Sequence, residues 1–322
     1  MSRATAPTIA VLALAAAAAT ATLAPATASA ERWSKTYETG GAAELQLLAD
    51  DAQIHVVGGP DPRIRIEVEA EGWKIGSGGL RLLESQTGGQ VRFSLREPHF
   101  ELHLFDIGRR QVRIEVHAPA GTRLEIKTGD GNVACEGFAG PARIDTGDGN
   151  ITVDGLRGDI TLHTGDGRVD ARGLDGSLVA STGDGRVRAG GRFDALEVTT
   201  SDGGVTVDVA PGSRVAGGWR VRSGDGPVVL RLPDDLKATI DAHSGDGGIT
   251  LDVPVHMLGA MRDNSLRATM NGGGPELEVR TGDGSIVLEP YAEGAAGAHS
   301  SDAWDDKATG TRHGVRPVRR GH

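Results

Sequence analysis

The sequence predicts an all-β protein: a single β-solenoid, or β-helix-like fold, built from 18-residue coils that hold two short strands each. Three observations support this prediction. The tetrapeptide Thr-Gly-Asp-Gly recurs at a fixed interval along the chain. Apolar residues occupy the same four positions around each recurrence. The composition, with 49 glycines and only 3% aromatic residues, suits a thin core bounded by many tight turns. A strict repeat of this length is typical of stacked architectures.

The aspartate at the centre of each repeat marks one coil. The regular interval joins Asp130, Asp148, Asp166, Asp184 and Asp202, and looser or degenerate coils surround Asp51, Asp225, Asp246 and Asp283. Positions −6, −4, +3 and +5 from each of these aspartates are apolar. Around Asp166 they are Ile160, Leu162, Val169 and Ala171. Since side chains alternate along a strand, these positions face one side of two strands. They predict a core that each coil buries against its neighbours.

The Thr-Gly-Asp-Gly segment predicts a tight corner between the two strands. We expect its glycines to supply backbone conformations with positive φ. We expect its aspartate to accept hydrogen bonds from the amides of its own turn. The second turn of each coil is looser, as in Gly155-Leu156-Arg157-Gly158.

Two segments depart from the repeat within a predicted solenoid domain of residues 31–290. Residues 71–120 contain strand-like alternation at 91–95, 100–104 and 112–116, and we expect this insertion to cover or extend the amino-terminal end, where a bare solenoid would expose strand edges. Residues 253–272 form a second insertion, and the interval from Asp246 to Asp283 is close to two coils. Residues 291–322 lose the periodicity and are expected to form a disordered tail.

Residues 1–30 predict a secretory signal peptide. Arg3 precedes an apolar run from Ile9 to Ala19, and Ala28-Ser29-Ala30 matches a cleavage site. The run is short for a membrane span, and no later apolar stretch is long enough for one. We therefore expect a protein without a membrane span that is periplasmic or extracellular. Cleavage would leave 33 basic and 44 acidic residues, a net charge of −11, which argues against nucleic acid as a partner.

The corner aspartates are the main candidate site. In register, Asp130, Asp148, Asp166, Asp184 and Asp202 would form an acidic edge, and a cation such as Ca²⁺ bridging neighbouring carboxylates would relieve their repulsion. The alternative is that solvent and turn hydrogen bonds stabilise each aspartate without metal. The calcium-binding nonapeptide repeat has the same period of nine, but its aspartate positions fall here on apolar residues such as Ile151 and Val169.

Two further constellations are weak candidates for chemistry. His99, Glu101 and His103 share one face of an expected strand, but the two histidines would lie about 13 Å apart, too far for one metal ion. Cys135, the only cysteine, occupies an inward position and is expected to be buried and inert.

A polysaccharide-active enzyme would need one distinctive carboxylate pair, whereas the repeat offers many equivalent ones. The sequence therefore indicates a protein that is not an enzyme and has no cofactor.

The repeat resembles a known group of bacterial proteins. The Thr-Gly-Asp-Gly units, the preceding strand at Arg123–Lys127 and the opening Ile54-His55-Val56-Val57-Gly58-Gly59 are similar to the putative-adhesin family, β-strand-repeat proteins of the cell envelope described as a domain of unknown function. The resemblance covers about residues 40–290. It implies a β-solenoid with an envelope or surface role, and it brings no catalytic residues.

These observations favour a secreted, non-enzymatic, adhesin-like β-solenoid that acts as a binding or structural module of the envelope. The partner is unknown, and an envelope glycan or protein would suit the regular polar outer surface, which presents Arg168, Asp170, Arg172, Arg186 and Arg188. The alternatives are a cation-dependent surface protein that uses the acidic edge and a polysaccharide-active β-helix enzyme.

Overall fold

The computed structural model describes residues 30–76, 78–98, 110–259 and 262–292. Over these ranges every helix or strand found is a β-strand, so the all-β prediction is confirmed. The expected strand at 100–104 lies outside the described residues. The expected signal peptide and carboxy-terminal tail lie almost wholly outside them.

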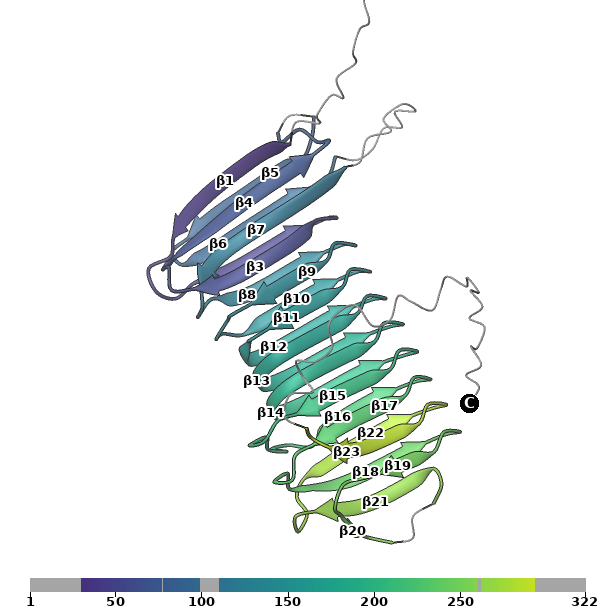
Figure 1. The fold of residues 1–322 in the computed structure, drawn as a ribbon. Helices are drawn as coiled ribbons and strands as arrows, with labels where there is room; N and C mark the ends of the chain where they lie inside the picture. Colours follow the sequence, from purple (N-terminus) through teal and green to yellow (C-terminus); the bar gives the residue numbers. More distant parts are fainter. Residues whose placement is uncertain (1–29, 77, 99–109, 260–261, 293–322) are drawn as a thin grey trace, which may run out of the picture.

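The strands form two stacks along an elongated, solenoid-like body (Figure 1). The first stack holds the strand before each corner aspartate. In spatial order it contains β5 (Arg81–Thr87), β6 (Gln90–Arg96), β2 (Glu44–Ala49), β8 (Arg123–Thr128), β10 (Ala142–Thr146), β12 (Arg157–Thr164), the second halves of β13 (Val169–Thr182) and β14 (Val187–Thr200), β16 (Trp219–Ser223), β22 (Glu276–Thr281), β18 (Ala238–Ser244), β21 (Ser265–Met270) and β20 (His256–Met257).

The second stack holds the strand after each corner. In spatial order it contains β1 (Glu31–Glu38), β4 (Arg63–Glu71), β7 (Gln111–Pro119), β3 (Gln53–Gly59), β9 (Val133–Glu136), β11 (Ile151–Asp154), the first halves of β13 and β14, β15 (Val205–Val209), β17 (Val228–Leu232), β23 (Ile286–Pro290) and β19 (Ile249–Leu251). β13 and β14 pass through the second turn and so contribute to both stacks.

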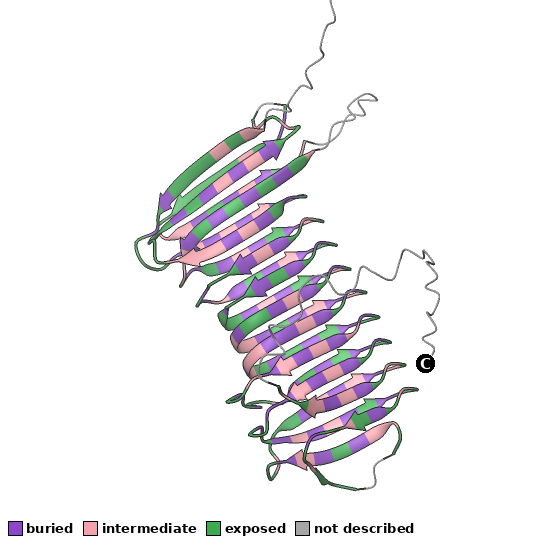
Figure 2. Ribbon diagram, viewed as in Figure 1, coloured by how far each residue is buried: buried purple, intermediate pink, exposed green. Residues whose placement is uncertain are grey.

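Neighbouring coils in the regular part of the body pair with an offset of one full repeat. Ala142 lies opposite Ile160 in the first stack, and Ile151 lies opposite Val169 in the second. All of the inward positions predicted from the repeat are buried except Leu251, which is partly exposed in the coil at the carboxy-terminal end. Figure 2 shows the resulting alternation of buried and exposed residues along the strands. The core is therefore a set of apolar columns, one per inward position.

The second turn of each coil is filled from inside by a large apolar side chain. Phe138, Leu156, Leu174 and Phe193 are buried there. Positive φ angles occur at this turn, for example 65° at Gly155 and 61° at Gly173. The expectation that glycines at the aspartate corner supply positive φ is wrong, because no glycine of the regular Thr-Gly-Asp-Gly corners has one.

At the amino-terminal end the coils do not stack in chain order. β6 pairs with the outer edge of β2, and β7 pairs with the outer edge of β3. Although β6 and β7 come later in the chain, they therefore lie nearer the amino-terminal end of the body than β2 and β3. β4 then pairs antiparallel with β7, β1 with β4, and β5 with β6. The strands predicted at 91–95 and 112–116 are present as β6 and β7. The body therefore ends in antiparallel strands rather than in a bare coil.

The carboxy-terminal end repeats this arrangement. β22 inserts between β16 and β18, and β23 inserts between β17 and β19, so the last coil of the chain is the last but one in space. The coils of Asp246 and Asp283 are thus direct neighbours, although a long segment of chain separates them. This segment does not add a coil. It contributes β20 and β21, which continue the first stack beyond β18 in antiparallel pairing.

The register makes a direct prediction about two adjacent residues. Val169 is fully buried and Arg168 is exposed. Val169→Asp places an unpaired charge in the core and should lower the free energy of unfolding by about 3–5 kcal/mol. Arg168→Asp should be mild. Thermal unfolding of both variants checks this, and equal melting temperatures would contradict the register.

Candidate functional site

The threonine of each Thr-Gly-Asp-Gly corner ties its coil to the one before. Thr164 is fully buried, and its Oγ1 lies 2.8 Å from the carbonyl oxygen of Gly149 and 3.2 Å from that of Gly147, to which it donates. The same oxygen accepts the N–H of Gly167 at 3.1 Å. Equivalent hydroxyl contacts are made by Thr146, Thr182, Thr200, Ser223, Ser244 and Thr281. A buried hydroxyl column therefore follows the corner, which the apolar pattern alone did not predict.

The glycine after each corner aspartate allows this close contact. A Cβ atom on Gly149 would overlap the carbonyl oxygen of Gly131, and one on Gly167 would overlap that of Gly149. Glycine is needed here because the backbones of successive coils approach too closely for a side chain. The corner is thus specified by backbone proximity, not by a left-handed conformation.

The corner aspartates themselves point to solvent. Asp130, Asp148, Asp166, Asp184 and Asp202 are all exposed, one in each successive coil. Contrary to expectation, none of these five carboxylates accepts a hydrogen bond from its own turn among the described residues. At the corners of Asp166, Asp202 and Asp225 a threonine or serine hydroxyl accepts a turn amide instead. In the described part of the chain no group of three or more His, Cys, Asp or Glu side chains is arranged to hold a metal ion. The cation edge stays a hypothesis from the sequence.

The remaining sequence candidates lie apart from this corner. Cys135 is buried, and burial together with the nearby Glu136 carboxylate raises the pKa of its thiol to about 12. A thiol in this environment is protonated at neutral pH and is a poor nucleophile. His99, Glu101 and His103 lie outside the described residues.

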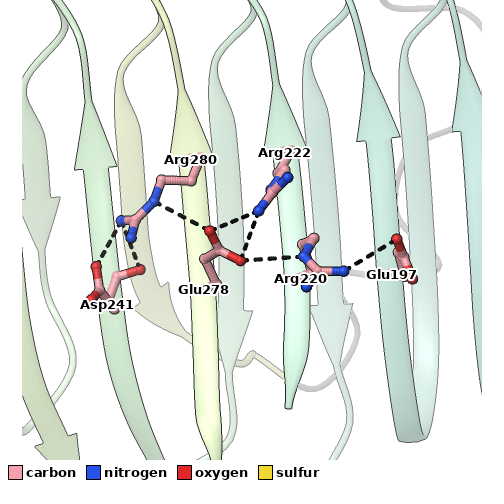
Figure 3. Close-up of polar contacts among 6 residues, drawn as sticks. All are labelled: Glu197, Arg220, Arg222, Asp241, Glu278 and Arg280. Atoms are coloured by element: carbon pink, nitrogen blue, oxygen red, sulfur yellow. Dashed lines mark hydrogen bonds and ion pairs between the residues drawn. The ribbon is translucent and has the colours of Figure 1, made fainter.

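A ladder of ion pairs crosses the outer face of the first stack near its carboxy-terminal end (Figure 3). It consists of Glu197, Arg220, Arg222, Asp241, Glu278 and Arg280. Glu278 on β22 accepts hydrogen bonds from Arg222 at 2.9 Å and from Arg220 at 3.2 Å, both on β16. Arg280, also on β22, donates to Asp241 of β18 at 2.7 Å. The inserted strand β22 is therefore bound on both sides by charged pairs as well as by its backbone.

The electrostatics of the ladder favour ionised Glu278. Partial burial raises the pKa of this carboxyl, but hydrogen bonds from Arg222 and Arg220 and the charge of Arg280 outweigh it, and the pKa is lowered overall. The second stack has a matching contact, in which Arg231 of β17 donates to Glu289 of the inserted β23 at 2.7 Å. These pairs join strands that come from distant parts of the chain.

A hollowed polar surface covers the outer face of the second stack at its amino-terminal end. Three adjoining shallow hollows lie over β1, β4, β7, β3, β9 and β11, and we call this surface the amino-terminal face. Arg113 and Glu115 of β7 line both the hollow over β3 and the hollow over β1. Arg65 of β4 lines the hollow over β1 and also the remaining one, beside Pro60. The three hollows are thus one continuous surface, with β7 at its centre.

Most charges on the amino-terminal face are paired. Ion pairs join Arg32 to Glu69, Arg63 to Asp61 and Arg65 to Glu67, and the His55 ring lies within hydrogen-bond distance, 3.1 Å, of the Glu136 carboxylate. By contrast, Arg113 and Glu115 are exposed and make no ion pair or side-chain hydrogen bond with another described residue. A cation and an anion that face solvent where hollows meet are available to an incoming partner.

The family model described as Toastrack DUF4097 matches residues 65–289. The chain belongs to this family. The resemblance to the putative-adhesin family inferred from the sequence is thereby confirmed. The match begins in β4 and ends in β23, so it spans the regular corners and the inserted strands β22 and β23, whereas β1, β2 and β3 precede it. No curated protein matches the chain.

Several solved structures are similar to this Toastrack protein at low identity. A putative cell adhesion protein from Clostridium sporogenes is 13% identical, with 81% of this chain and 100% of that chain covered and a TM-score of 0.31. A putative adhesin from Bacteroides fragilis is 11% identical, with 81% and 98% covered and a TM-score of 0.38. A putative lipid binding protein from Parabacteroides distasonis is 12% identical, with 80% and 96% covered and a TM-score of 0.40. Likeness at this level carries no conclusion about function.

In the described part of this Toastrack chain, none of the elements is a helix long and apolar enough to cross a membrane.

The corner contact predicts which glycines tolerate a methyl group. Gly167→Ala forces the coils apart and should lower stability by about 2–3 kcal/mol, which is roughly 5–10 °C in melting temperature. Gly121→Ala is the control, since a Cβ there meets open space and the φ angle of Gly121 is not positive. If Gly167→Ala melts like the wild type, the close approach at the corner is wrong.

The ladder predicts a pH dependence of stability. Because the folded-state pKa of Glu278 lies below its unfolded value, its contribution is complete above the unfolded pKa of about 4.3 and is lost as pH falls through the folded value. Glu278→Gln should cost about 1 kcal/mol at pH 7 and much less near pH 3. Thermal melts at both values test this, with Glu125→Gln on β8 as the control. An equal loss at both pH values would contradict it.

Proposed function

We propose that the chain is a secreted, non-enzymatic, adhesin-like module of the cell envelope that binds a partner through the amino-terminal face. Membership of the Toastrack family and the solenoid-like architecture support a role as a rigid, extended scaffold. The single observation that carries the proposal is the position of Arg113 and Glu115, which lie without described ionic partners where the hollows of this face join.

The chemistry of the amino-terminal face suits a polar, extended partner such as an envelope glycan or a protein segment. Arginine and carboxylate groups on alternate residues of one strand lie about 6.6–6.8 Å apart, and they can bind hydroxyl, amide or ionic groups on the same ligand. The hollows are shallow and open along the strands. Contacts of this kind are individually weak, so useful binding would need several copies of the module or of the ligand.

Secretion completes the proposal. The amino-terminal segment has the composition of a signal peptide, and the strands of the body begin at Glu31, directly after its expected cleavage site. On this basis the mature protein would begin at β1, beside the proposed binding face.

Capture of envelope components tests the proposal. The chain without residues 1–30, immobilised, should retain a specific envelope glycan or protein. Arg113→Glu should reduce retention at least about tenfold, because a buried or partly buried interfacial charge pair that is reversed costs more than about 1.4 kcal/mol.

The control variant is Arg172→Glu, an exposed arginine of β13 on the same stack that makes no ion pair in the described structure. It should retain the partner normally. Equal retention by the two variants would show that the amino-terminal face does not bind, and melting temperatures close to the wild type would show that both variants are folded.

A further inference from the structure

Exposed apolar side chains gather at the carboxy-terminal end of the body. The large hydrophobic residues that are exposed among those described are Leu83, Val179, Met257 and Leu258. Met257 and Leu258 are consecutive, with 39% and 54% of their surface accessible, and they lie at and just after β20. This strand forms the end of the body opposite β1 (Figure 1). Adjacent exposed apolar side chains on a soluble protein indicate a contact surface.

Arginines lie beside Leu258, the second residue of this apolar pair. Leu258 lines a shallow hollow together with Arg262, Arg267 and Arg280. Arg280 is engaged by Asp241 in the ladder of Figure 3, at 2.7 Å. The side chains of Arg262 and Arg267 form no ion pair or hydrogen bond with any other residue that the structure describes. Two guanidinium groups without described partners thus lie beside the exposed side chain of Leu258, which follows the exposed Met257 in the chain.

We propose that this surface, which consists of Met257, Leu258, Arg262 and Arg267 and which we call the tip, docks on an anionic lipid bilayer. The two apolar side chains would enter the boundary between headgroups and acyl chains. The two guanidinium groups would pair with lipid phosphates, whose oxygens match their planar donors. Neither an apolar partner nor an inorganic anion fits this surface as well, because the first would leave the arginines unpaired and the second would leave the apolar side chains in water.

The charge of the rest of the chain favours docking by the tip alone. The whole sequence carries a net charge of −10, so a broadside approach to an anionic membrane is repulsive. Such repulsion fades beyond a Debye length of about 8 Å at physiological salt. A body that touches the membrane only at one end keeps most of its acidic surface outside that range. The tip would therefore hold the solenoid end-on, with the amino-terminal face at the end of the body far from the bilayer.

The opposite end offers a matched comparison. Leu83 on β5 is more exposed, at 65%, but it is a single apolar residue. The carboxylate next to it, Glu84, binds Lys35 at 2.5 Å, and Arg96 of the neighbouring strand is bound by Asp50 at 2.7 Å. Arg81 on the same strand and Arg92 on the neighbouring strand are both exposed, and neither forms an ion pair or side-chain hydrogen bond with another described residue. An exposed leucine near two arginines without described partners is thus common to both ends, and the tip differs in having two consecutive exposed apolar residues.

Flotation with lipid vesicles tests the proposal. The chain without residues 1–30 should float with vesicles of phosphatidylcholine and phosphatidylglycerol and should not float with phosphatidylcholine alone. High salt should release it. Arg262→Gln and Arg267→Gln should each weaken partition about fivefold, the usual effect of one basic residue near an anionic surface. Leu258→Asp should abolish flotation.

The control is Leu83→Asp, which removes the other exposed leucine and should leave flotation unchanged. Melting temperatures of all variants should stay close to that of the wild type, because the altered side chains are exposed. The proposal is overturned if the wild type does not float with anionic vesicles, or if Leu258→Asp and Leu83→Asp behave alike. Envelope capture through Arg113 is measured separately, so either proposal can fail while the other stands.

Discussion

The close contact between the corner of one coil and the corner of the next is the constraint on which the rest of the structure depends. The glycine after each corner aspartate lies against a carbonyl of the preceding coil, as Gly167 does against Gly149, and leaves no room for a Cβ. A buried threonine hydroxyl such as that of Thr164 binds the same carbonyl. Backbone and hydroxyl together set the spacing and register of the coils, because a slip of one residue would place a side chain where only hydrogen fits.

Once the corners fix the register, only the outward positions of the strands can vary in chemistry. Inward positions repeat as apolar columns, and outward positions repeat as columns whose chemistry is free to vary. In the middle of the body each outward residue has neighbours on both sides. At the ends and at the inserted coils this regular neighbour pattern stops, and the arrangement of charged side chains differs from place to place. Glu278 and Arg280 bind an inserted strand on both of its sides, whereas Arg113 and Glu115 have no described partner.

The sequence predicts the regular part of this structure well because two periods coincide there. Alternation along each strand and the 18-residue repeat identify inward positions that are all buried except Leu251, which departs because it lies in the end coil. The role of the corner glycines was mispredicted, since a glycine can be selected by conformation or by proximity, and the sequence does not distinguish the two. The order of the end coils depends on long-range pairing, such as β16 with β22, that no local pattern encodes. The amino-terminal face and the tip were missed for the same reason, as their residues come from strands that only the fold brings together.

The insertion of coils at both ends has a physical consequence for an extended protein. In a simple solenoid the terminal coil is also the end of the chain, so it can separate without disturbing its neighbours. Here β22 and β23 are held between two other coils, and β2 and β3 are likewise held between β6–β7 and β8–β9. Release of either outermost coil then breaks its contacts to these inserted strands, which stay paired with the next coil toward the middle of the body. Both ends can therefore carry partly unpaired, hydrated surfaces without becoming the points at which the body unravels, which is the property that the two proposed binding surfaces would require.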